Sequence, residues 1–400
     1  MLTSSILNSD MHAAQIKPEI KLIAILSRPQ LTEQHKLKAG RLLENGVDIA
    51  TFRKLLDQHR VSPCVYSNIR DHFNNIFSAQ LVGELHQQYL QNVERNKFLL
   101  KTFFALLNGF KRASIPVAPV KGILLAQTLY GDVAKRHFND IDLLIHPCNL
   151  MRANVALNAL GFHCEIFDSF PTHILLRILK KQKDLIYVNA AGVMLELHLR
   201  LANVTTNLSI TFNELLFTHS HNTVLYQNEA FLYLCWHGMN SFFHRLKWLC
   251  DLAIIIDTMD IDWEQMYATA CRLDCVRTLT ISVVLSHLIF ETILPSQADK
   301  YYSNNRICRW LFALAKKNIN SDALSLTPYT WCILIYVVLP TSWISKVGGI
   351  TFLCKPGYHE FKTLPIYLKK MGVVYYFIRP ISFLRRRRLF LKDIPATQSK

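Results

Sequence analysis

The chain has 400 residues, of which 50% are hydrophobic and 18% are charged, and its formal net charge is +16. This length allows two or three packed subdomains with a sizeable core, so the chain can fold by itself. A transmembrane helix is not expected, because no uninterrupted apolar run reaches the roughly 18 residues that such a helix needs. The most apolar stretch, TWCILIYVVLP at residues 330–340, is too short and predicts a buried helix or strand.

The amino terminus and the cysteines both indicate a cytoplasmic protein. Residues 1–19 lack the basic start and apolar core that are typical of a secretion signal. The 10 cysteines show no CxxC pair and no regular spacing, which is typical of reduced, mostly buried thiols.

Helical spacing dominates the first part of the chain. From about residue 20 to residue 110 the apolar positions recur every three or four residues, as in QNVERNKFLLKTFFALLNGF. We therefore expect a helical amino-terminal lobe over residues 1–111.

The pattern changes to alternating strands and helices over residues 112–205. The expected elements are a short strand in IPVAPV, a helix GILLAQTLY closed by Gly131, a strand FNDIDLLI, a helix CNLMRANVALNAL ended by Gly161, a strand FHCEIF, a helix near THILLRILKK, and two strands, DLIYVNA and GVMLELHLR, joined by a tight Ala-Gly turn. This order predicts a small α/β (α+β) core with a mixed sheet, flanked by helical regions on both sides.

Helices return in the remaining part of the chain. Asn228 is the expected N-cap of a helix that breaks near Asn240, and helical spacing continues to about residue 320. The glycines and prolines of VGGITFLCKPGYHEF predict a loop. We divide this part into a helical carboxyl-terminal lobe over residues 206–345 and a basic tail region over residues 346–400.

Two carboxylates share one face of the strand FNDIDLLI. Residues two apart in a strand point to the same side, so Asp140 and Asp142 lie together while Ile141 and Leu143 point to the core. The pair repels unless a cation lies beside it, and Mg²⁺ bound by one or two carboxylates and substrate phosphates is the common arrangement. The alternative is a polar strand end in which one Asp caps the following turn and the other is solvated.

A third carboxylate lies on the strand GVMLELHLR, where Met194, Glu196 and His198 share one face. Glu196 would complete a metal cluster with the acid pair if the two strands are neighbours. The alternative for Glu196 is an exposed edge residue. If the acid pair is a metal site, Asp140→Asn and Asp142→Asn are each expected to abolish activity and, by relieving repulsion, to melt no lower than the wild type.

Lys121 and Gly122 lie at a transition from strand to helix. Free backbone N–H groups and the helix dipole favour an anion at such a point, and a lysine can add a mobile positive charge. The alternative is an ordinary helix start with no ligand.

Several separated motifs occur in an order that resembles a known family. They are KG at Lys121, then LYGD, an arginine ahead of DIDLLI, GF at Gly161, and LELHLR. With the amino-terminal segment LLDQHRVSPCVYSNI and the later segment CWHGMNSFFHRLKWLCDLA, they resemble the bacterial uncharacterised nucleotidyltransferase family, a branch of the DNA polymerase beta-like nucleotidyltransferase superfamily. The resemblance covers about residues 20–260.

The resemblance implies Mg²⁺ (or Mn²⁺) held by the catalytic carboxylates Asp140, Asp142 and Glu196, and a nucleoside triphosphate as substrate. It implies substrate binding by Lys121, Gly122, Arg136, His198, His237, Arg245 and Asp251. Lys121 and Gly122 stand where other superfamily members carry a glycine-serine pair. The acceptor stays open among a sugar, a small molecule, a protein hydroxyl and an RNA end, and the resemblance suggests a place in surface-polysaccharide or other secondary biosynthesis.

The downstream residues allow ordinary structural interpretations as well. Lys247 and Asp251 are four residues apart and could form an ion pair on a helix surface. Trp248 fits a core position better than a platform for a base, and His237 fits a core histidine better than a substrate contact.

The basic tail favours a second hypothesis, a catalytically inactive module of the same fold that binds nucleic acid or an anionic membrane surface. Residues 346–400 contain 12 Lys and Arg against 2 Asp and Glu, and LRRRRLF follows the aromatic stretch VVYYFIRPISF. Basic charge beside aromatic residues suits the interface of an anionic membrane. The tail therefore predicts peripheral contact with the inner membrane surface or an anionic polymer, although a solvated charge run would have the same composition.

Overall fold

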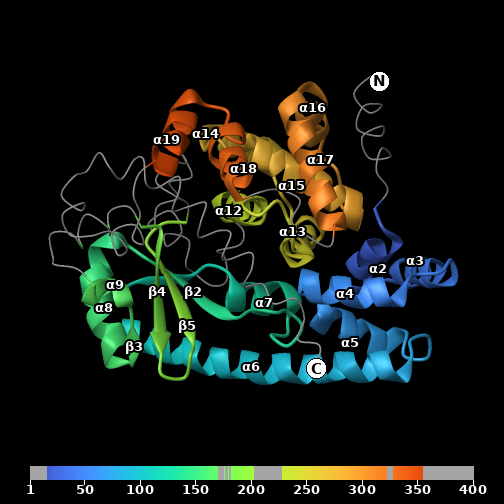
Figure 1. Ribbon diagram of the computed structural model, residues 1–400, viewed down its shortest axis with the longest axis horizontal. Helices are drawn as coiled ribbons and strands as arrows, with labels where there is room; N and C mark the ends of the chain where they lie inside the picture. The colour runs from blue at the N-terminus through green and yellow to red at the C-terminus, as the bar shows by residue number, and fades with distance from the viewer. Residues whose placement is uncertain are drawn as a thin grey trace.

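The computed structural model describes residues 16–169, 175, 179, 182–201, 228–321 and 328–354. The predicted helix near THILLRILKK falls largely outside these residues, and so does the basic tail from residue 355 onward. No helix within the described ranges is long and apolar enough to cross a membrane. Figure 1 shows a mixed α/β fold, with the sheet between a long lower helix and a group of upper helices.

The amino-terminal region is helical, as predicted. Its helices are α2 (Pro18–Leu26), α3 (Glu33–Glu44), α4 (Ile49–His59), α5 (Ser62–His72) and α6 (Ala79–Arg112). Side chains cap three of them, because Thr32, Asp48 and Ser78 accept hydrogen bonds from backbone N–H groups at the starts of α3, α4 and α6. The boundary predicted at residue 111 lies at the end of α6, although the division into lobes stays a prediction.

The middle of the chain forms one five-stranded mixed sheet. Its elements are β1 (Val117–Pro119), α7 (Gly122–Tyr130), β2 (Asp140–Ile145), η1 (Pro147–Asn149), α8 (Leu150–Ala159), β3 (Phe162–His163), α9 (Glu165–Asp168), β4 (Asp184–Asn189) and β5 (Met194–His198). The strand order is β1-β2-β5-β4-β3, in which β2 and β5 are parallel and the other pairs antiparallel. The expected α/β core with a mixed sheet is confirmed.

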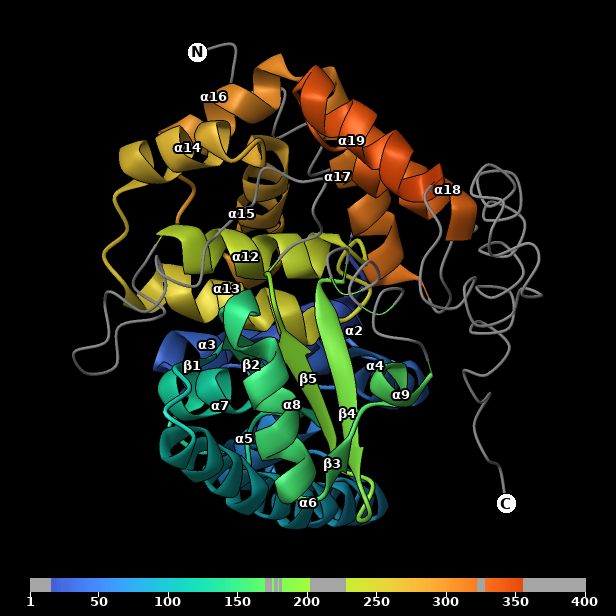
Figure 2. The ribbon, with the colours of Figure 1, turned by 90° about the vertical axis from the view of Figure 1, so that its left-hand side faces the viewer.

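The two faces of the sheet pack against different helices. Ile141, Leu143 and Ile145 of β2 pack with Leu195 and Leu197 of β5 in one hydrophobic cluster with residues of α6 and α8. Figure 2 shows α8 and α6 lying against the sheet on this side. The alternate residues of β2 and β5 therefore face the other way, toward the helices that follow the sheet in sequence.

The carboxyl-terminal region adds a second layer of helices. It contains α12 (Asn228–Met239), α13 (Leu246–Thr258), α14 (Trp263–Arg272), α15 (Val276–Phe290), α16 (Ser296–Asn304), α17 (Arg306–Asn320), α18 (Pro328–Ile333), η3 (Leu334–Val338) and α19 (Trp343–Cys354). The break between α12 and α13 lies at Phe242 and Phe243, which both have positive φ values. Gly238 makes this turn possible, because a Cβ there would lie 2.2 Å from the Phe243 ring.

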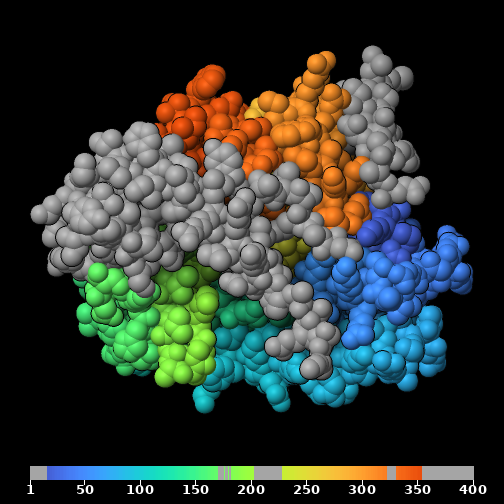
Figure 3. Space-filling model, in the orientation of Figure 1, coloured from blue at the N-terminus to red at the C-terminus, as the bar shows by residue number. Residues whose placement is uncertain are grey.

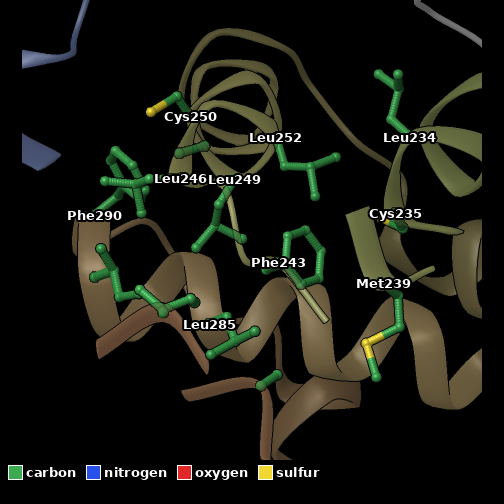
Figure 4. Packing of buried hydrophobic residues seen from close by; sticks show 14 of the residues in the cluster. Leu234, Cys235, Met239, Phe243, Leu246, Leu249, Cys250, Leu252, Leu285 and Phe290 are labelled. Carbon is green, nitrogen blue, oxygen red and sulfur yellow. The ribbon is translucent and has the colours of Figure 1, made fainter. Parts of the chain in front are cut away.

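The amino-terminal and carboxyl-terminal helices share one hydrophobic core. A single cluster of buried residues includes Leu22 and Ile23 of α2 together with Leu249 of α13 and Leu285 of α15. Figure 4 shows Phe243, Leu249 and Leu285 at close range in this cluster. In Figure 3 the orange surface of the carboxyl-terminal helices lies directly against the blue surface of the amino-terminal ones. The two helical regions therefore pack as one body.

Helix α15 lies at the centre of this core and is buried on nearly all sides. A helix of this kind must satisfy its polar side chains internally. Thr280, Ser282 and Ser286 do so by donating to backbone carbonyls four residues earlier, at 2.7 to 2.9 Å.

Two local predictions are wrong. FHCEIF is a strand only at Phe162–His163 and then turns into the short helix α9. The predicted loop VGGITFLCKPGYHEF begins inside the helix α19 (Trp343–Cys354), and its part from residue 355 lies outside the described residues. Gly349 permits close packing rather than a turn, because a Cβ at this position would lie 1.8 Å from the backbone oxygen of Tyr336. The stretch at residues 330–340, left open between helix and strand, is helical in α18 and η3.

Candidate active site

Strand pairing sets two carboxylates side by side on the face of the sheet that is turned away from α6. In the parallel register of β2 and β5, Asp142 lies opposite Glu196, and Asp140 lies opposite Met194. Asp140, Asp142 and Glu196 line a cavity of about 220 Å³ between the sheet and helices α7, α12 and α13. The alternation that the sequence predicted for the acid pair is present, and Glu196 is on a neighbouring strand.

The Lys121 ammonium group contacts the carboxylates directly. Its Nζ atom is 2.6 Å from Asp142 Oδ1 and 3.6 Å from Glu196 Oε2. Lys121 and Asp142 are both buried, with side chains only 9% and 4% exposed. A phosphate contact was the predicted role of Lys121, whereas in this structure its ammonium group lies between the carboxylates of Asp142 and Glu196.

Gly122 brings the backbone of this turn close to β2. Its φ is +40°, and a Cβ added there would lie 3.4 Å from the Asp140 carbonyl oxygen and 3.6 Å from Asp142 Oδ2. These distances are ordinary van der Waals contacts, so the space would admit a Cβ. The positive φ is what favours glycine, because a side chain at residue 122 would strain the backbone of the turn.

His198 is the third group on the carboxylates. Its Nε2 lies 2.9 Å from Asp142 Oδ1 and 3.5 Å from Glu196 Oε2. Each of Asp142, Glu196 and His198 offers a ligand atom, and these atoms lie within 4.8 Å of one another, so the three residues could hold a metal ion. The metal-binding set predicted from the sequence was Asp140, Asp142 and Glu196, so His198 takes the place of Asp140 in the set that the geometry favours. Asp140 still lines the cavity.

The two acids of the pair have opposite ionisation behaviour. Burial, with the nearby Asp142 and Glu196 carboxylates, raises the pKa of Asp140. Burial acts in the same direction on Asp142, but Lys121 and His198 outweigh it and hold the pKa of Asp142 well below its ordinary value. Although burial acts to lower it, the Asp142 carboxylate raises the pKa of Lys121 well above its ordinary value. Asp142 and Lys121 are therefore a buried ion pair, and Asp140 is an acid without a matched cation.

Three further cations line the same cavity and form its cationic wall, Arg60, Arg245 and Lys247. Within the described part of the chain, no carboxylate lies within ion-pair distance of any of them. Burial and the neighbouring guanidinium groups lower the pKa of Lys247 to about 7, and burial and Arg60 lower the pKa of Arg245 to about 10. Such a cluster of mutually repelling cations is a favourable site for an anion.

Arg136 and Asp251 bind each other at the base of the cavity. Arg136 Nε and Nη2 donate to the two oxygens of Asp251 at 2.9 and 2.8 Å, and Nη1 donates to the Gly122 carbonyl at 3.2 Å. The Tyr130 hydroxyl adds a hydrogen bond to Asp251 at 3.1 Å. This bidentate pair joins α13 to the turn that carries Lys121.

His237 and Trp248 complete the wall beside the cations. Their rings meet edge to face with centroids 5.3 Å apart, and the Arg245 guanidinium lies 5.7 Å from the Trp248 ring centroid. Burial, with the charge of Lys121, holds the pKa of His237 well below its ordinary value, so the ring is neutral. Trp248 packs against the hydrophobic core and also lines the cavity.

Nine of the ten site residues predicted from the sequence line the cavity: Lys121, Gly122, Arg136, Asp140, Asp142, Glu196, His237, Arg245 and Asp251. The tenth, His198, does not line it but contacts the Asp142 carboxylate. Sequence reasoning missed Arg60 and misread Lys247. Lys247 forms no surface pair with Asp251, which is bound to Arg136, but instead donates to the His137 carbonyl at 3.4 Å. Arg60 ends α4 in a left-handed conformation, which no sequence signal predicted.

Comparison with protein families gives one match. A family model described as "Uncharacterised nucleotidyltransferase" matches residues 45–291, more than half of the chain. The matched span runs from α4 to the end of α15, so it includes every residue that lines the cavity. No curated protein matches the chain, and no solved structure matches it either.

Proposed function

Because this chain belongs to the uncharacterised nucleotidyltransferase family, we propose that it transfers a nucleotidyl group from a nucleoside triphosphate to an acceptor hydroxyl in a reaction that requires Mg²⁺ or Mn²⁺. One observation carries the proposal. A single cavity is lined by clustered carboxylates and by three cations that have no carboxylate within ion-pair distance in the described part of the chain. Charge of both signs in one cavity suits a triphosphate that is bound together with a divalent cation.

The carboxylates fit a hard divalent cation. Asp142 and Glu196 face each other in register, Asp140 lies beside them, and a cation, the Lys121 ammonium, already contacts two of them. Oxygen donors of this kind suit Mg²⁺ and Mn²⁺, and the nearby His198 nitrogen would be tolerated better by Mn²⁺. When bound, the ion supplies charge neutralisation for the phosphates during transfer.

The cationic wall would bind the phosphates. Arg60 and Arg245 can each present several N–H donors, and Lys247, whose pKa burial and the neighbouring guanidinium groups lower to about 7, can take up a proton when an anion binds. With the Asn139 amide turned so that its neighbours are satisfied, its oxygen accepts a hydrogen bond from Arg60 Nη1 at 3.2 Å, which leaves the charge of the guanidinium uncancelled.

Glu196 is the residue that we assign to proton transfer. Its side chain is 25% exposed, the most open of the carboxylates that contact Lys121. An acceptor hydroxyl that enters the cavity can therefore reach it and lose its proton as the oxygen attacks the α-phosphate. Asp142, which is more deeply buried and already bonded to two groups, would serve to bind and orient.

The proposal is tested by incubating the purified protein with each nucleoside triphosphate, with and without Mg²⁺ or Mn²⁺, and resolving the products by mass. Acceptor pools would include sugars, polysaccharide precursors, RNA and protein. We expect metal-dependent release of pyrophosphate that is lost in Glu196→Gln. Nucleotide or nucleic-acid binding without any turnover would favour the inactive binding module instead.

The lowered pKa of Lys247 predicts a pH dependence of nucleotide binding. A bound polyphosphate raises the lysine pKa again, so binding above about pH 7 takes up a proton and weakens as the pH rises. Between about pH 7.5 and 9, where ATP no longer changes charge, we expect the affinity for ATP to fall by up to about tenfold per pH unit. Lys247→Arg keeps its charge across this range, so its affinity should stay nearly constant by calorimetry. An equal fall in both proteins would contradict the assignment.

We also propose that the protein works in the cytoplasm, at an anionic membrane surface. Helix α19 exposes a row of large apolar side chains on one face, with Trp343 and Ile344 78% and 80% exposed and Val347 and Ile350 about half exposed. The packing of Gly349 on Tyr336 fixes the opposite face inward. Residues 346–400, with their excess of 10 positive charges, 12 against 2, begin in this helix. An apolar face with a basic segment provides the two signals that peripheral binding needs.

Vesicle binding should follow this helix face. We expect the full chain to sediment with anionic vesicles at low salt and much less with neutral ones, and we expect the double variant Trp343→Ser with Ile344→Ser to lose most of this binding. Val155→Ser, which alters an equally exposed residue of α8 (70% exposed), is the matched control and should bind like the wild type. Equal sedimentation with neutral and anionic vesicles, or retention of binding by the double variant, would contradict the proposal.

A further inference from the structure

Lys121 occupies the position that a metal ion would need. Its Nζ lies within 3.6 Å of both Asp142 Oδ1 and Glu196 Oε2, and these oxygens belong to the candidate metal-binding set. His198 Nε2 also lies 2.9 Å from Asp142 Oδ1, so this oxygen already has two donors. A divalent ion therefore cannot take up the full coordination of these carboxylates while the ammonium stays where it is.

The backbone around Lys121 holds the residue in place. The Val120 N–H donates to the Asp142 carbonyl at 3.3 Å, Pro119 pairs with Leu143, and Arg136 holds the Gly122 carbonyl at 3.2 Å. The lysine Cα is thus fixed beside β2, and only the flexible side chain can move. Lys121 also lines the cavity, so its ammonium can reach an anion there without any change of the fold.

Two cations this close repel strongly in a site of low polarity. Metal entry must therefore displace the Lys121 ammonium, which is nearly excluded from water. Among the described residues, only Asp142 and Glu196 offer this ammonium a carboxylate, so it has no other carboxylate to which it can move. A triphosphate in the cavity changes this balance, because its oxygens offer the ammonium a new partner. Nucleotide binding therefore draws the ammonium away from the metal site, and metal binding releases the ammonium to contact the nucleotide.

We propose that Lys121 is an internal counter-cation that holds the metal site closed until a nucleotide draws it away, so that metal and nucleotide load the cavity cooperatively. This inference rests on the proposed function, since it concerns the same carboxylates. Cooperative loading is reciprocal: the nucleotide raises the affinity for metal by the same factor by which metal raises the affinity for nucleotide. A cavity built in this way binds free metal ions more weakly when no nucleotide is present.

Direct binding of Mn²⁺ without nucleotide tests the inference. Calorimetry or Mn²⁺ magnetic resonance would compare the wild type with Lys121→Met, which keeps the length of the side chain and removes its charge. We expect Lys121→Met to bind Mn²⁺ at least about tenfold more tightly than the wild type. We also expect it to bind ATP more weakly in EDTA, because the lysine no longer meets the phosphates.

Lys247→Met is the matched control when binding is measured at about pH 6, below the lysine pKa of about 7, because it then removes one positive charge from the same cavity but not from between the carboxylates. We expect its Mn²⁺ affinity to stay within about threefold of the wild type, which measures the long-range effect of one lost charge. If Lys121→Met folds only with metal, the Mn²⁺ concentration that restores its circular dichroism is an upper limit on the dissociation constant of the folded site, because part of the binding free energy drives folding. A limit at least about tenfold below the wild-type dissociation constant supports the inference, and a limit above the wild-type value contradicts it.

The outcomes separate the inference from the proposed function. Equal or weaker Mn²⁺ binding by Lys121→Met, in a wild type that consumes nucleoside triphosphates, would overturn the counter-cation and leave the enzyme intact. An equal gain in Lys121→Met and Lys247→Met would overturn it too, since the effect would then be long-range. No Mn²⁺ binding by any of the three proteins, and no turnover, would overturn both.

Discussion

Asp140→Asn and Asp142→Asn should both abolish nucleotidyl transfer and yet change stability in opposite directions. Each removes an oxygen ligand from the carboxylate cluster, so we expect activity to fall by at least about a hundredfold in both. Asp142→Asn also leaves the buried Lys121 ammonium without its partner at 2.6 Å. Breaking a buried ion pair from one side costs about 3–5 kcal/mol, so this variant should melt well below the wild type in EDTA.

Asp140 differs because no lysine or arginine lies within ion-pair distance of it in the described part of the chain. Burial and two neighbouring carboxylates raise its pKa, so Asp140→Asn should melt at or above the wild-type temperature in EDTA. The sequence predicted no loss of stability for either variant, and the ion pair revises that expectation for Asp142. Stability changes of the same sign and size would contradict the assignment of Lys121 to Asp142.

Acidification gives a second measure of the same ion pair. A depressed carboxyl pKa stabilises the folded protein at pH values above the ordinary value of 3.8, and this stabilisation is lost as the pH falls toward the lowered value. Asparagine has no such contribution. The difference in melting temperature between the wild type and Asp142→Asn should therefore narrow below about pH 4.

The second large effect is expected at Arg136 and Asp251. Both side chains are almost fully buried, and they form two hydrogen bonds with each other. Arg136→Met or Asp251→Leu alone leaves a buried charge unpaired, so each should lower the free energy of unfolding by about 3–5 kcal/mol. The double variant replaces both charges with apolar groups and should recover most of this loss, as measured by denaturant unfolding.

The double variant also tests what the pair does. The family resemblance implies that Arg136 and Asp251 bind substrate, whereas their contacts support a role in holding the Gly122 turn against α13. We expect the double variant to keep ATP affinity within a few-fold of the wild type. Recovered stability with strongly reduced ATP affinity would instead support direct contact with the substrate. Tyr130→Phe, which removes one neutral hydrogen bond to Asp251, should cost only about 1 kcal/mol.

The acid pair could be found from the sequence because strand periodicity is local. Alternation of Asp140 and Asp142 with Ile141 and Leu143 fixes which side chains share a face, whatever the rest of the chain does. The pairing of β2 with β5 brought Glu196 opposite Asp142, and the motif order of the family carried that information.

The cationic wall could not be found in this way. Arg60 belongs to the end of α4, and Lys247 belongs to α13, so only the packing of these helices on the sheet brings the two together. Helical spacing suggested a pair between Lys247 and Asp251, but a stronger competitor, the bidentate Arg136, holds that carboxylate. Local rules cannot predict such competition between distant residues.

The glycines of α19 mark the same limit. In sequence a Gly-Gly pair favours a loop, because glycine is a weak helix former. In the structure Gly349 lets the helix touch the backbone of Tyr336, and the packing gained there outweighs the propensity. Glycine marks a special position in both interpretations, but only the contact with Tyr336 in η3 shows that the position serves close helix packing and not a turn.

The shared core has a consequence for how the chain folds during synthesis. Helix α2 at the start of the chain buries its apolar face in a cluster that also contains residues of α15, α16 and α17, which leave the ribosome some 250 residues later. Until then its apolar side chains have no native partners, so we expect nascent chains that end before α15 to bind chaperones and to be sensitive to protease. A fragment limited to residues 45–291 would lack α2, α16 and α17, three of the helices that pack on α15, and should aggregate when expressed alone.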